Sequence, residues 1–354
     1  MSGLHIAITA DPYLPVPPRL YGGIERVLDF LVRGLAARGH RVTLFAHPDS
    51  HVPATLVPYG SPPHFQKSDR ARELWQVGAQ LWRRRHEFDL IHSFGRLAAL
   101  APVLAVRGLP KIQSYQRDRL PWSSIRTARR LGQQSIQFTA CSTNVYRDVP
   151  ARDGSFGQWH TVFNGVDLAK YTFRHEVGED APLVFLGRIE PIKGAHHAIA
   201  IARAAGRRLV IAGNQVRECR DYFDAAIAPH IDGDRVQYLG PVDDAAKNEM
   251  LSHAAALLMP IEWEEPFGIV MAEAMACGTP VVGFARGSVG EVVRNGVNGY
   301  ACRGLADAVW SVGRLHTIDR AAVRRDCEQR FSSTVVVERY EQLYRGLCPK
   351  AGRD

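Results

Sequence analysis

Two carboxylates lie eight positions apart, Glu265 and Glu273, in the stretch EEPFGIVMAEAMACGTPVV. Pro266, between them, suits the first position of a helix, where its missing N–H costs nothing. Three free backbone N–H groups would then lie at a helix N-terminus, which attracts anions, at Phe267, Gly268 and Ile269. Glu273 would lie roughly 9–12 Å along that helix. The pattern predicts a ligand with hydroxyls at both ends and phosphates between them.

Cations and glycines elsewhere suit the same ligand. GRIEPIKG offers Arg188 and Lys193 after a buried-looking strand, and two cations beside a diphosphate would neutralise the charge that grows as a nucleotide leaves. In YGGIERV, Gly22 and Gly23 precede a helical pattern and would let the backbone approach a phosphate. A nucleotide sugar is a ligand of this kind.

Five segments, in this order, resemble those of the retaining glycosyltransferases of family 4: YGGIERV, NGVD, GRIEPIKG, EPFGIVMAE and RGSVGEVVRNGVNGY. The resemblance is strong from about residue 164 to 300 and weaker from about 48 to 163. It implies an α/β protein of the GT-B fold, with two doubly wound Rossmann-like domains facing across a cleft. The C-terminal domain would hold the donor, and the N-terminal domain the acceptor.

The resemblance also implies roles for the residues. Gly22, Gly23, Arg188 and Lys193 would contact the donor diphosphate, Glu265 the sugar hydroxyls and Glu273 the ribose hydroxyls. Arg188, Lys193 and Glu265 would be the catalytic set. A carboxylate can accept hydrogen bonds from two vicinal hydroxyls at once, as ribose recognition needs.

FDLIHSFG resembles the family segment D-x-x-H-x-H, in which His92 matches the first His and Phe94 replaces the second. The replacement leaves the donor-sugar contacts and the acceptor preference open. Retaining transfer of this type is thought to pass the acceptor proton to the leaving phosphate, so no protein base is required. We interpret His92 as a structural residue at a strand end rather than a catalyst.

The DGD sequence from Asp232 to Asp234 occupies a turn-like loop and is not interpreted as a metal-binding D-x-D. We expect no metal and no cofactor, the nucleotide diphosphate sugar being a co-substrate. Two carboxylates could also serve a glycosidase as general acid and base, but a glycosidase has no diphosphate to bind.

Short apolar runs alternate with amphipathic stretches, which indicates parallel α/β architecture. Strands are expected at 4–10, 41–46, 89–93, 110–115 and 136–141, then at 182–187, 207–213, 235–240, 255–260 and 279–284. Helices are expected at 24–38 and 69–86, with loops at 12–18 and 58–63. We predict an N-terminal domain of residues 1–172, completed by a crossover helix in 334–354, and a C-terminal domain of residues 173–333.

The 354 residues suit two domains, and 46% apolar with 23% charged residues is typical of a soluble globular protein. No apolar run is long enough to span a membrane, no signal peptide is recognised, and six scattered Cys indicate reduced thiols, so we expect a cytoplasmic protein.

The charge is distributed unevenly along the chain. Residues 1–173 carry 22 Lys and Arg against 12 Asp and Glu, whereas residues 174–354 carry 22 Lys and Arg against 24 Asp and Glu. The basic half has two interpretations of equal weight: an anionic partner, such as the inner face of a membrane, or a solvated Arg-rich surface with no partner. No motif in the sequence indicates nucleic-acid binding.

These features together predict a metal-independent retaining hexosyltransferase. It would move a sugar from a UDP- or GDP-sugar to an acceptor hydroxyl in glycan, glycolipid or polysaccharide synthesis. The acceptor could be a glycan, a lipid-linked sugar or a small molecule. Two alternatives stay open: a different reaction on this fold, such as a nucleotide-sugar 2-epimerase or a phosphorylase, and a non-catalytic nucleotide-sugar-binding protein.

Overall fold

The computed structural model describes residues 3–19, 22–60 and 67–348 and divides the chain into two compact units. The first unit is Met1–Asn164 with Ser333–Asp354, and the second is Gly165–Ser332. The sequence placed the first boundary at 172 and the second at 333. Tyr21 and part of the predicted loop 58–63 lie outside the described residues.

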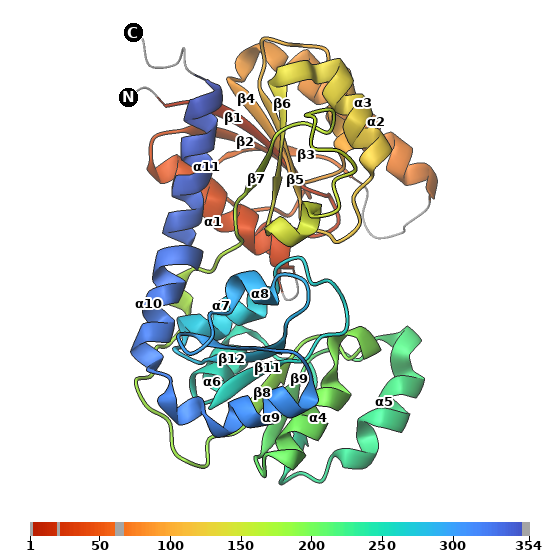
Figure 1. Cartoon of the computed structure of the whole chain (residues 1–354). Coiled ribbons are helices and arrows are strands. Elements are labelled where there is room, and N and C mark those ends of the chain that lie inside the picture. The colour runs from red at the N-terminus through yellow and green to blue at the C-terminus, as the bar shows by residue number, and fades with distance from the viewer. Residues whose placement is uncertain (1–2, 20–21, 61–66, 349–354) are drawn as a thin grey trace. The chain divides into compact units, whose positions relative to one another are not determined.

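The first unit is a seven-stranded parallel sheet with helices packed on it, in strand order β3-β2-β1-β4-β5-β6-β7 (Figure 1). Its elements are β1 (His5–Thr9), α1 (Gly23–Ala37), β2 (Arg41–Ala46), β3 (Thr55–Pro58), α2 (Lys67–Arg83), β4 (Leu90–Ser93), β5 (Lys111–Tyr115), α3 (Trp122–Gly132), β6 (Ile136–Ala140), β7 (Trp159–Thr161) and α11 (Ser333–Leu347). The strand order reverses between β1 and β4, which is where open α/β sheets bind ligands.

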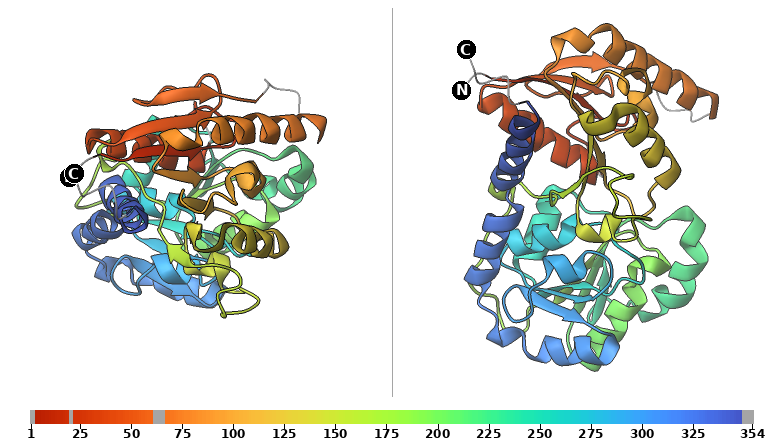
Figure 2. Two further views of the ribbon diagram at one scale, coloured as in Figure 1. Left: turned by 90° about the horizontal axis from the view of Figure 1, so that it is seen from above. Right: turned by 45° about the horizontal axis from the view of Figure 1, so that its top comes forward.

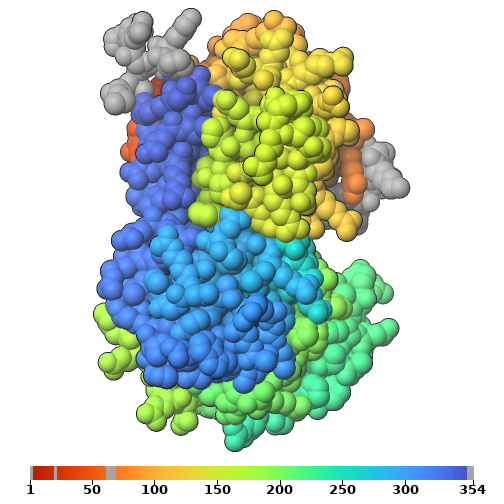
Figure 3. Space-filling model, viewed as in Figure 1, coloured from red at the N-terminus to blue at the C-terminus, as the bar shows by residue number. Residues whose placement is uncertain are grey.

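The last helix of the described chain belongs to this first unit. α11 lies beside α1, where Gly34 has no side chain and Val337 packs against its backbone. Its tyrosines Tyr340 and Tyr344 are fully buried, and Glu341 pairs with His40 at 3.1 Å. Both views in Figure 2 show the two helices side by side, and Figure 3 shows the outward face of α11 in blue.

The second unit is a six-stranded parallel sheet in the order β10-β9-β8-β11-β12-β13. Its elements are β8 (Leu183–Leu186), α4 (Ala195–Ala204), β9 (Leu209–Ala212), α5 (Arg220–Ala226), β10 (Val236–Tyr238), α6 (Asp244–Ser252), β11 (Ala256–Met259), α7 (Ile269–Ala276), β12 (Val281–Phe284), α8 (Val289–Val292), β13 (Gly299–Cys302), α9 (Leu305–Gly313) and α10 (Arg320–Phe331). One core cluster joins the faces of β8, β9 and β11 to α4 and α9. Its strand order reverses between β8 and β11.

Most predicted elements are confirmed, but three edge strands are new: β3, β7 and β13. β3 has no fully buried residue, and β7 has only three residues. The DGD loop is a turn in which the Asp232 carboxylate accepts from the N–H groups of Asp234 and Val236. Among the described residues, no helix combines the length and apolarity needed to cross a membrane.

Candidate functional site

The predicted donor residues of the second unit gather at the carboxyl edge of its sheet. Arg188 and Lys193 follow β8, and Glu265 follows β11, its neighbour in the sheet. These two strands flank the point at which the strand order reverses. Loops that follow such strands diverge, and they leave a crevice in which ligands of doubly wound sheets bind.

Lys193 and Glu265 form the centre of this group. The Lys193 ammonium lies 2.6 Å from Oε2 of Glu265, and both side chains are largely buried. The indole N–H of Trp263 donates to the same oxygen at 3.0 Å, and the ammonium lies 4.4 Å from the centre of the Trp263 ring. A cation and a carboxylate are thus held together beside an aromatic face, which is charge-assisted pairing with added cation–π attraction.

Backbone contacts force these loops together. Gly194 adopts φ +77° at the start of α4, and a Cβ there would overlap the carbonyl of Pro260. The N–H of Glu262 donates to the carbonyl of Ile192 at 2.9 Å. Only a glycine allows this approach without strain. Gly194 therefore allows Lys193 to reach the loop that carries Glu265.

A second glycine supports the same loop from the other side. Gly287, at φ +56°, packs on the backbone of Glu265, and a Cβ there would overlap its N and O atoms. The N–H of Gly287 donates to the carboxylate of Glu264, and that of Ser288 donates to the carbonyl of Glu265. Glu264 is therefore a structural residue of the loop.

The helix after Glu265 begins later than predicted. α7 starts at Ile269, with Gly268 as its N-cap at φ +70°, so Pro266 is not its first residue. A left-handed residue interrupts the helical backbone, which is why the helix cannot extend back to Pro266. The Phe267 side chain is buried and packs against Phe331.

The start of α7 nevertheless lies beside the carboxylate. A Cβ on Gly268 would lie within van der Waals distance of Cγ of Glu265. Gly268 offers no side chain to cap the helix, so the N-terminal amide groups of α7 depend on other acceptors. An anionic group of a ligand is such an acceptor, because it is also attracted by the helix dipole.

Glu273 is the fifth residue of α7 and is buried in a polar cluster of its own. Its Oε1 accepts from the Lys247 ammonium at 2.6 Å and from the Tyr171 hydroxyl at 2.7 Å. Lys247 also pairs with Asp244 at 3.1 Å. A helix rise of 1.5 Å per residue puts Glu273 only about 6 Å from the start of α7, less than the sequence suggested.

Arg188 is the most exposed of the predicted set. Its side chain is 44% exposed, and its Nε lies 2.9 Å from the carboxylate of Glu190, two residues later. The exposed pair is weak and can exchange partners readily. Arg188 is thus free to turn toward an anionic ligand at the same sheet edge.

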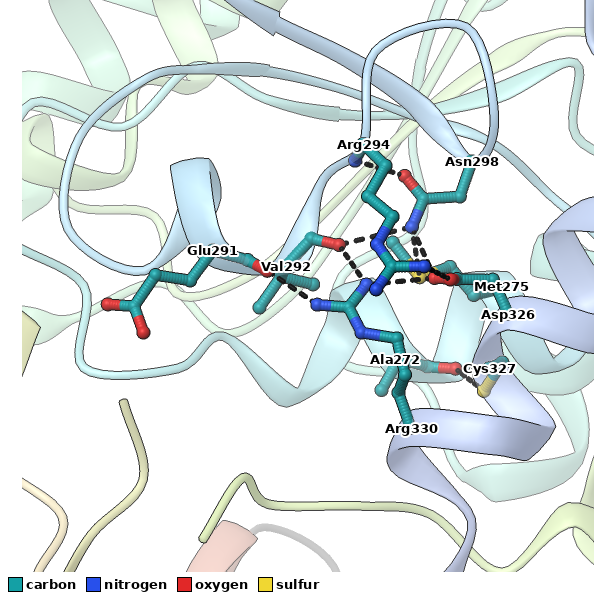
Figure 4. A network of polar contacts seen from close by, with 9 residues as sticks. All are labelled: Ala272, Met275, Glu291, Val292, Arg294, Asn298, Asp326, Cys327 and Arg330. Carbon is teal, nitrogen blue, oxygen red and sulfur yellow. Dashed lines mark hydrogen bonds and ion pairs between the residues drawn. The ribbon is translucent and has the colours of Figure 1, made fainter. Parts of the chain in front are cut away.

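A buried network fixes α7 and α8 against α10 (Figure 4). The Asp326 carboxylate accepts from Arg294 at 2.8 Å, Asn298 at 2.7 Å and Arg330 at 2.9 Å. Arg330 also donates to the carbonyl groups of Glu291 and Val292 at the end of α8. Glu291, Val292, Arg294 and Asn298 belong to the RGSVGEVVRNGVNGY segment, so the network joins this segment to Asp326 and Arg330 of α10.

The remaining predicted residues, Gly22, Gly23 and His92, belong to the first unit. Gly22 caps α1 and Gly23 begins it, as expected, after the carboxyl end of β1. His92 is fully buried and lies 2.6 Å from both the Tyr344 hydroxyl and the Ser114 hydroxyl. Burial lowers its pKa to about 3, so His92 is neutral at physiological pH and holds β4, β5 and α11 together. Phe94 packs against the His92 ring.

Sequence reasoning missed Trp263, Lys247 and Tyr171. Trp263 precedes the acidic pair Glu264–Glu265, and an aromatic residue beside a predicted sugar-binding carboxylate could have signalled its role. Lys247 and Tyr171 reach Glu273 from 26 and 102 positions away in the chain, and nothing local to either residue indicates that contact.

The arrangement can bind a polyanion with attached hydroxyls. The cations Arg188 and Lys193 and the N-terminus of α7 provide positive charge, and the Glu265 carboxylate accepts hydrogen bonds from hydroxyls. Groups of this kind, fixed before a ligand arrives, stabilise negative charge that develops on a leaving group.

Comparisons with known proteins agree with this chemistry. Residues 21–170 match the family model "Glycosyltransferase Family 4", and residues 170–309 match "Glycosyl transferases group 1". The glycogen synthase of Mycobacterium tuberculosis is 28% identical over 348 residues, which cover 84% of this chain and 83% of that protein.

Solved structures share the fold over nearly the whole chain. AviGT4, a glycosyltransferase involved in avilamycin A biosynthesis, is 27% identical with a TM-score of 0.72, and the match covers 98% of each chain. The Anabaena protein HepE, solved in complex with UDP and glucose, is 19% identical with a TM-score of 0.72, covering 97% of this chain and 100% of that one. With family models that together span residues 21–309, this chain belongs to the family 4 type of glycosyltransferases with the GT-B fold.

Proposed function

We propose that the protein transfers a hexose from a nucleotide diphosphate sugar to an acceptor hydroxyl, with retention at the anomeric carbon and without an essential metal. The contact of Lys193 with Glu265 carries the proposal, because it puts a phosphate-binding cation and a hydroxyl-binding carboxylate 2.6 Å apart. The N-terminus of α7 beside them suits the diphosphate.

In this reaction the bond from the anomeric carbon to the diphosphate oxygen breaks, and a bond to the acceptor oxygen forms on the same face of the sugar. The acceptor proton passes to the leaving phosphate oxygen, so the products are the glycosylated acceptor and the nucleoside diphosphate. Arg188 and Lys193 stabilise the negative charge that accumulates on the leaving group. Glu265 orients the sugar through its hydroxyls, and Glu273, with Lys247 and Tyr171, forms the ribose end of the site.

The donor base is proposed to be uracil or guanine. The HepE structure was solved with UDP and glucose, which supports a UDP-sugar. A GDP-sugar is the second candidate, because the groups described above bind the diphosphate and hydroxyls and not the base.

The acceptor is proposed to bind the first unit through its hydroxyls. Thr9, Ser93 and Gln113 are neighbours in register across β1, β4 and β5, at the carboxyl end of the sheet. All three are buried, and among the described residues their Oγ1, Oγ and Oε1 atoms have no hydrogen-bond partner. Water or substrate hydroxyls usually form hydrogen bonds with such buried polar atoms. This row of side chains therefore suits a glycan, a lipid-linked sugar or another polyhydroxylated acceptor.

We also propose that the enzyme acts in the cytoplasm, where its basic half contacts the anionic inner face of a membrane. On α2, Trp75 and Trp82 are 70% and 44% exposed and lie seven positions apart, on one side of the helix. The Arg85 guanidinium lies 3.9 Å from the Trp82 ring centre, and Arg83 ends the helix. Exposed tryptophans beside arginines are typical of surfaces that contact lipid headgroups.

A thermal-shift panel tests the donor proposal. UDP, GDP, ADP and their sugars are compared, because a ligand that binds only the native state raises its stability by mass action. We expect UDP or GDP and the corresponding sugar to raise the melting temperature. Failure of all six to do so would contradict the proposal.

Product analysis then tests the reaction. Incubation of the preferred donor with hydroxylated acceptors should yield a glycoside with the anomeric configuration of the donor, and excess chelator should not stop turnover. An inverted product, or activity lost in chelator and restored by Mg²⁺ or Mn²⁺, would overturn this mechanism. Isomerised sugar without acceptor would identify an epimerase instead.

A further inference from the structure

Two histidines and a glutamate form a cluster beside the donor residues that the reaction does not use. His196 and His197 are consecutive at the start of α4, and Glu262 belongs to the loop after β11. One ligand atom of each lies within 4.8 Å of those of the other two. Within the described ranges, this is the one group of three or more His, Cys, Asp or Glu side chains close enough to share a metal ion.

Contacts around the cluster already orient its ligands. Nδ1 of His196 lies 2.8 Å from the Tyr222 hydroxyl, so the other ring nitrogen, Nε2, is the one available to a metal. Nε2 of His197 lies 2.9 Å from Oε1 of Glu262, and the two imidazole rings are 4.0 Å apart. Metal-binding histidines are commonly held, as His196 is, by a hydrogen bond to the second ring nitrogen.

We propose that His196, His197 and Glu262 bind a Zn²⁺ ion, with water as the fourth ligand. Two imidazoles and one carboxylate are a recurring zinc ligand set, and three protein ligands leave one tetrahedral position open. Ligand atoms of tetrahedral zinc lie about 3.4 Å apart at bond lengths of about 2.05 Å. The His197 and Glu262 side chains are 27% and 40% exposed, so they can make the small inward movement, and the ion can reach them from solvent.

The ion would fasten α4 to the loop that carries Glu265. Glu262 stands three residues before Glu265, and its N–H donates to the carbonyl of Ile192, next to Lys193. Binding therefore stabilises the loops of the donor site without touching the reacting groups. None of Arg188, Lys193 and Glu265 is a ligand, so turnover does not depend on the ion.

A more exposed pair shows what the third ligand adds. His253 lies 3.1 Å from the carboxylate of Glu249 on α6, with side chains 42% and 71% exposed, but is not part of any such three-residue group in the described chain. His253→Ala is therefore the matched control. Removing His196 or His197 should weaken zinc binding, whereas removing His253 should not.

The test uses the full chain, stripped with chelator and dialysed, in calorimetric titration with Zn²⁺. One equivalent should bind, the melting temperature should rise, and His196→Ala, His197→Ala and Glu262→Gln should each raise the dissociation constant about tenfold or more. His197→Gln replaces His197→Ala if that variant fails to fold. His253→Ala should bind as the unmodified protein does.

Cobalt identifies the ligands, because thiolates give Co²⁺ an intense ultraviolet charge-transfer band and imidazole or carboxylate ligands do not. We expect the visible bands of tetrahedral Co²⁺ without the thiolate band. Absence of saturable binding at one equivalent, unchanged affinity in both histidine variants, or a thiolate band would each overturn the proposal. Nucleotide-induced stabilisation is measured in parallel, so failure of the zinc site and failure of the donor site are told apart.

Discussion

The Lys193–Glu265 ion pair sets the behaviour expected of the donor site. In the proposed reaction, a donor diphosphate would attract Lys193 away from Glu265, and the sugar hydroxyls would then give Glu265 new partners. Bare nucleoside diphosphate would offer no such hydroxyls to the carboxylate. We therefore expect the pair to favour the intact donor over the spent nucleotide, which would help the product to leave.

We expect Lys193→Met to remove most of the stabilisation by nucleotide. At a ligand concentration of 100 Kd the unmodified protein should gain about 2.7 kcal/mol. Each variant's melting temperature with ligand is compared with its own ligand-free value, and Lys170→Met, at an exposed lysine of the same unit, is the control. An undiminished shift in Lys193→Met would remove Lys193 from the donor site.

At the residue scale, the sequence predicted which residues belong to the site better than it predicted which side chains they contact. Lys193 and Glu265 were predicted to serve one ligand because their motifs carry that chemistry. The burial of Glu273 against Lys247 was not predicted, because the contact depends on how α6 packs on α7. Because of this contact, Glu273→Ala should also destabilise the fold, since it leaves the largely buried ammonium of Lys247 without this partner.

Among the elements, α10 supports the site through Asp326. Its carboxylate is 4% exposed and pairs with Arg294 and Arg330. We expect Asp326→Ala to lower the free energy of unfolding by about 3–5 kcal/mol, because it leaves buried donors without an anion. Glu328→Ala removes a half-exposed carboxylate that pairs with Arg324 on the same helix, and it should cost at most about 1 kcal/mol, because Arg324 keeps its hydrogen bond to the Ala276 carbonyl. Equal losses in denaturant unfolding of the two variants would contradict the role of the network.

α11 is held in the first unit by a histidine that cannot readily be protonated. Burial lowers the pKa of His92 from 6.5 to about 3, so below pH 6.5 the unfolded chain binds a proton that the folded chain excludes. The contribution of neutral His92 to the free energy of unfolding is therefore fully present above pH 6.5. It is lost as the pH falls toward 3, by up to about 1.4 kcal/mol per pH unit. His92→Gln should flatten this part of the curve of unfolding free energy against pH, and an unchanged slope would contradict the assignment.

Elements were predictable where burial made them continuous apolar runs. β2 has the predicted bounds, because RVTLFA is buried after its first residue. β3 and β7 lie at the two edges of their sheet and lack such runs, so periodicity did not reveal them. The start of α7 was predicted too early in the chain, because the positive φ of Gly268 cannot be read from the sequence.

For the whole molecule, the uneven charge is the property with the widest consequence. Each basic residue near an anionic bilayer contributes about 1 kcal/mol, screened by salt. The protein should co-sediment with vesicles containing anionic lipid at low salt, and less with neutral vesicles or at moderate salt. Equal binding to both vesicle types, or none, would favour a solvated surface and a soluble acceptor.

Variants locate the contact. Replacing Trp75 and Trp82 by Ser should reduce vesicle binding, because both are exposed beside basic residues of α2. Trp310→Ser removes a comparably exposed tryptophan of α9, in the near-neutral half of the chain, and should leave vesicle binding unchanged. Equal loss in both would place the contact elsewhere.

The position of α11 has a consequence for how the protein is made. Synthesis proceeds from the N-terminus, yet the first unit takes its last helix from residues 333–347. Until these residues leave the ribosome, the two buried tyrosines, one of which is the Tyr344 that contacts His92, are missing from its core. The second unit, whose residues are contiguous, can therefore finish folding first, although it is translated later. A chain interrupted near residue 332 would carry a complete second unit and an unfinished first one.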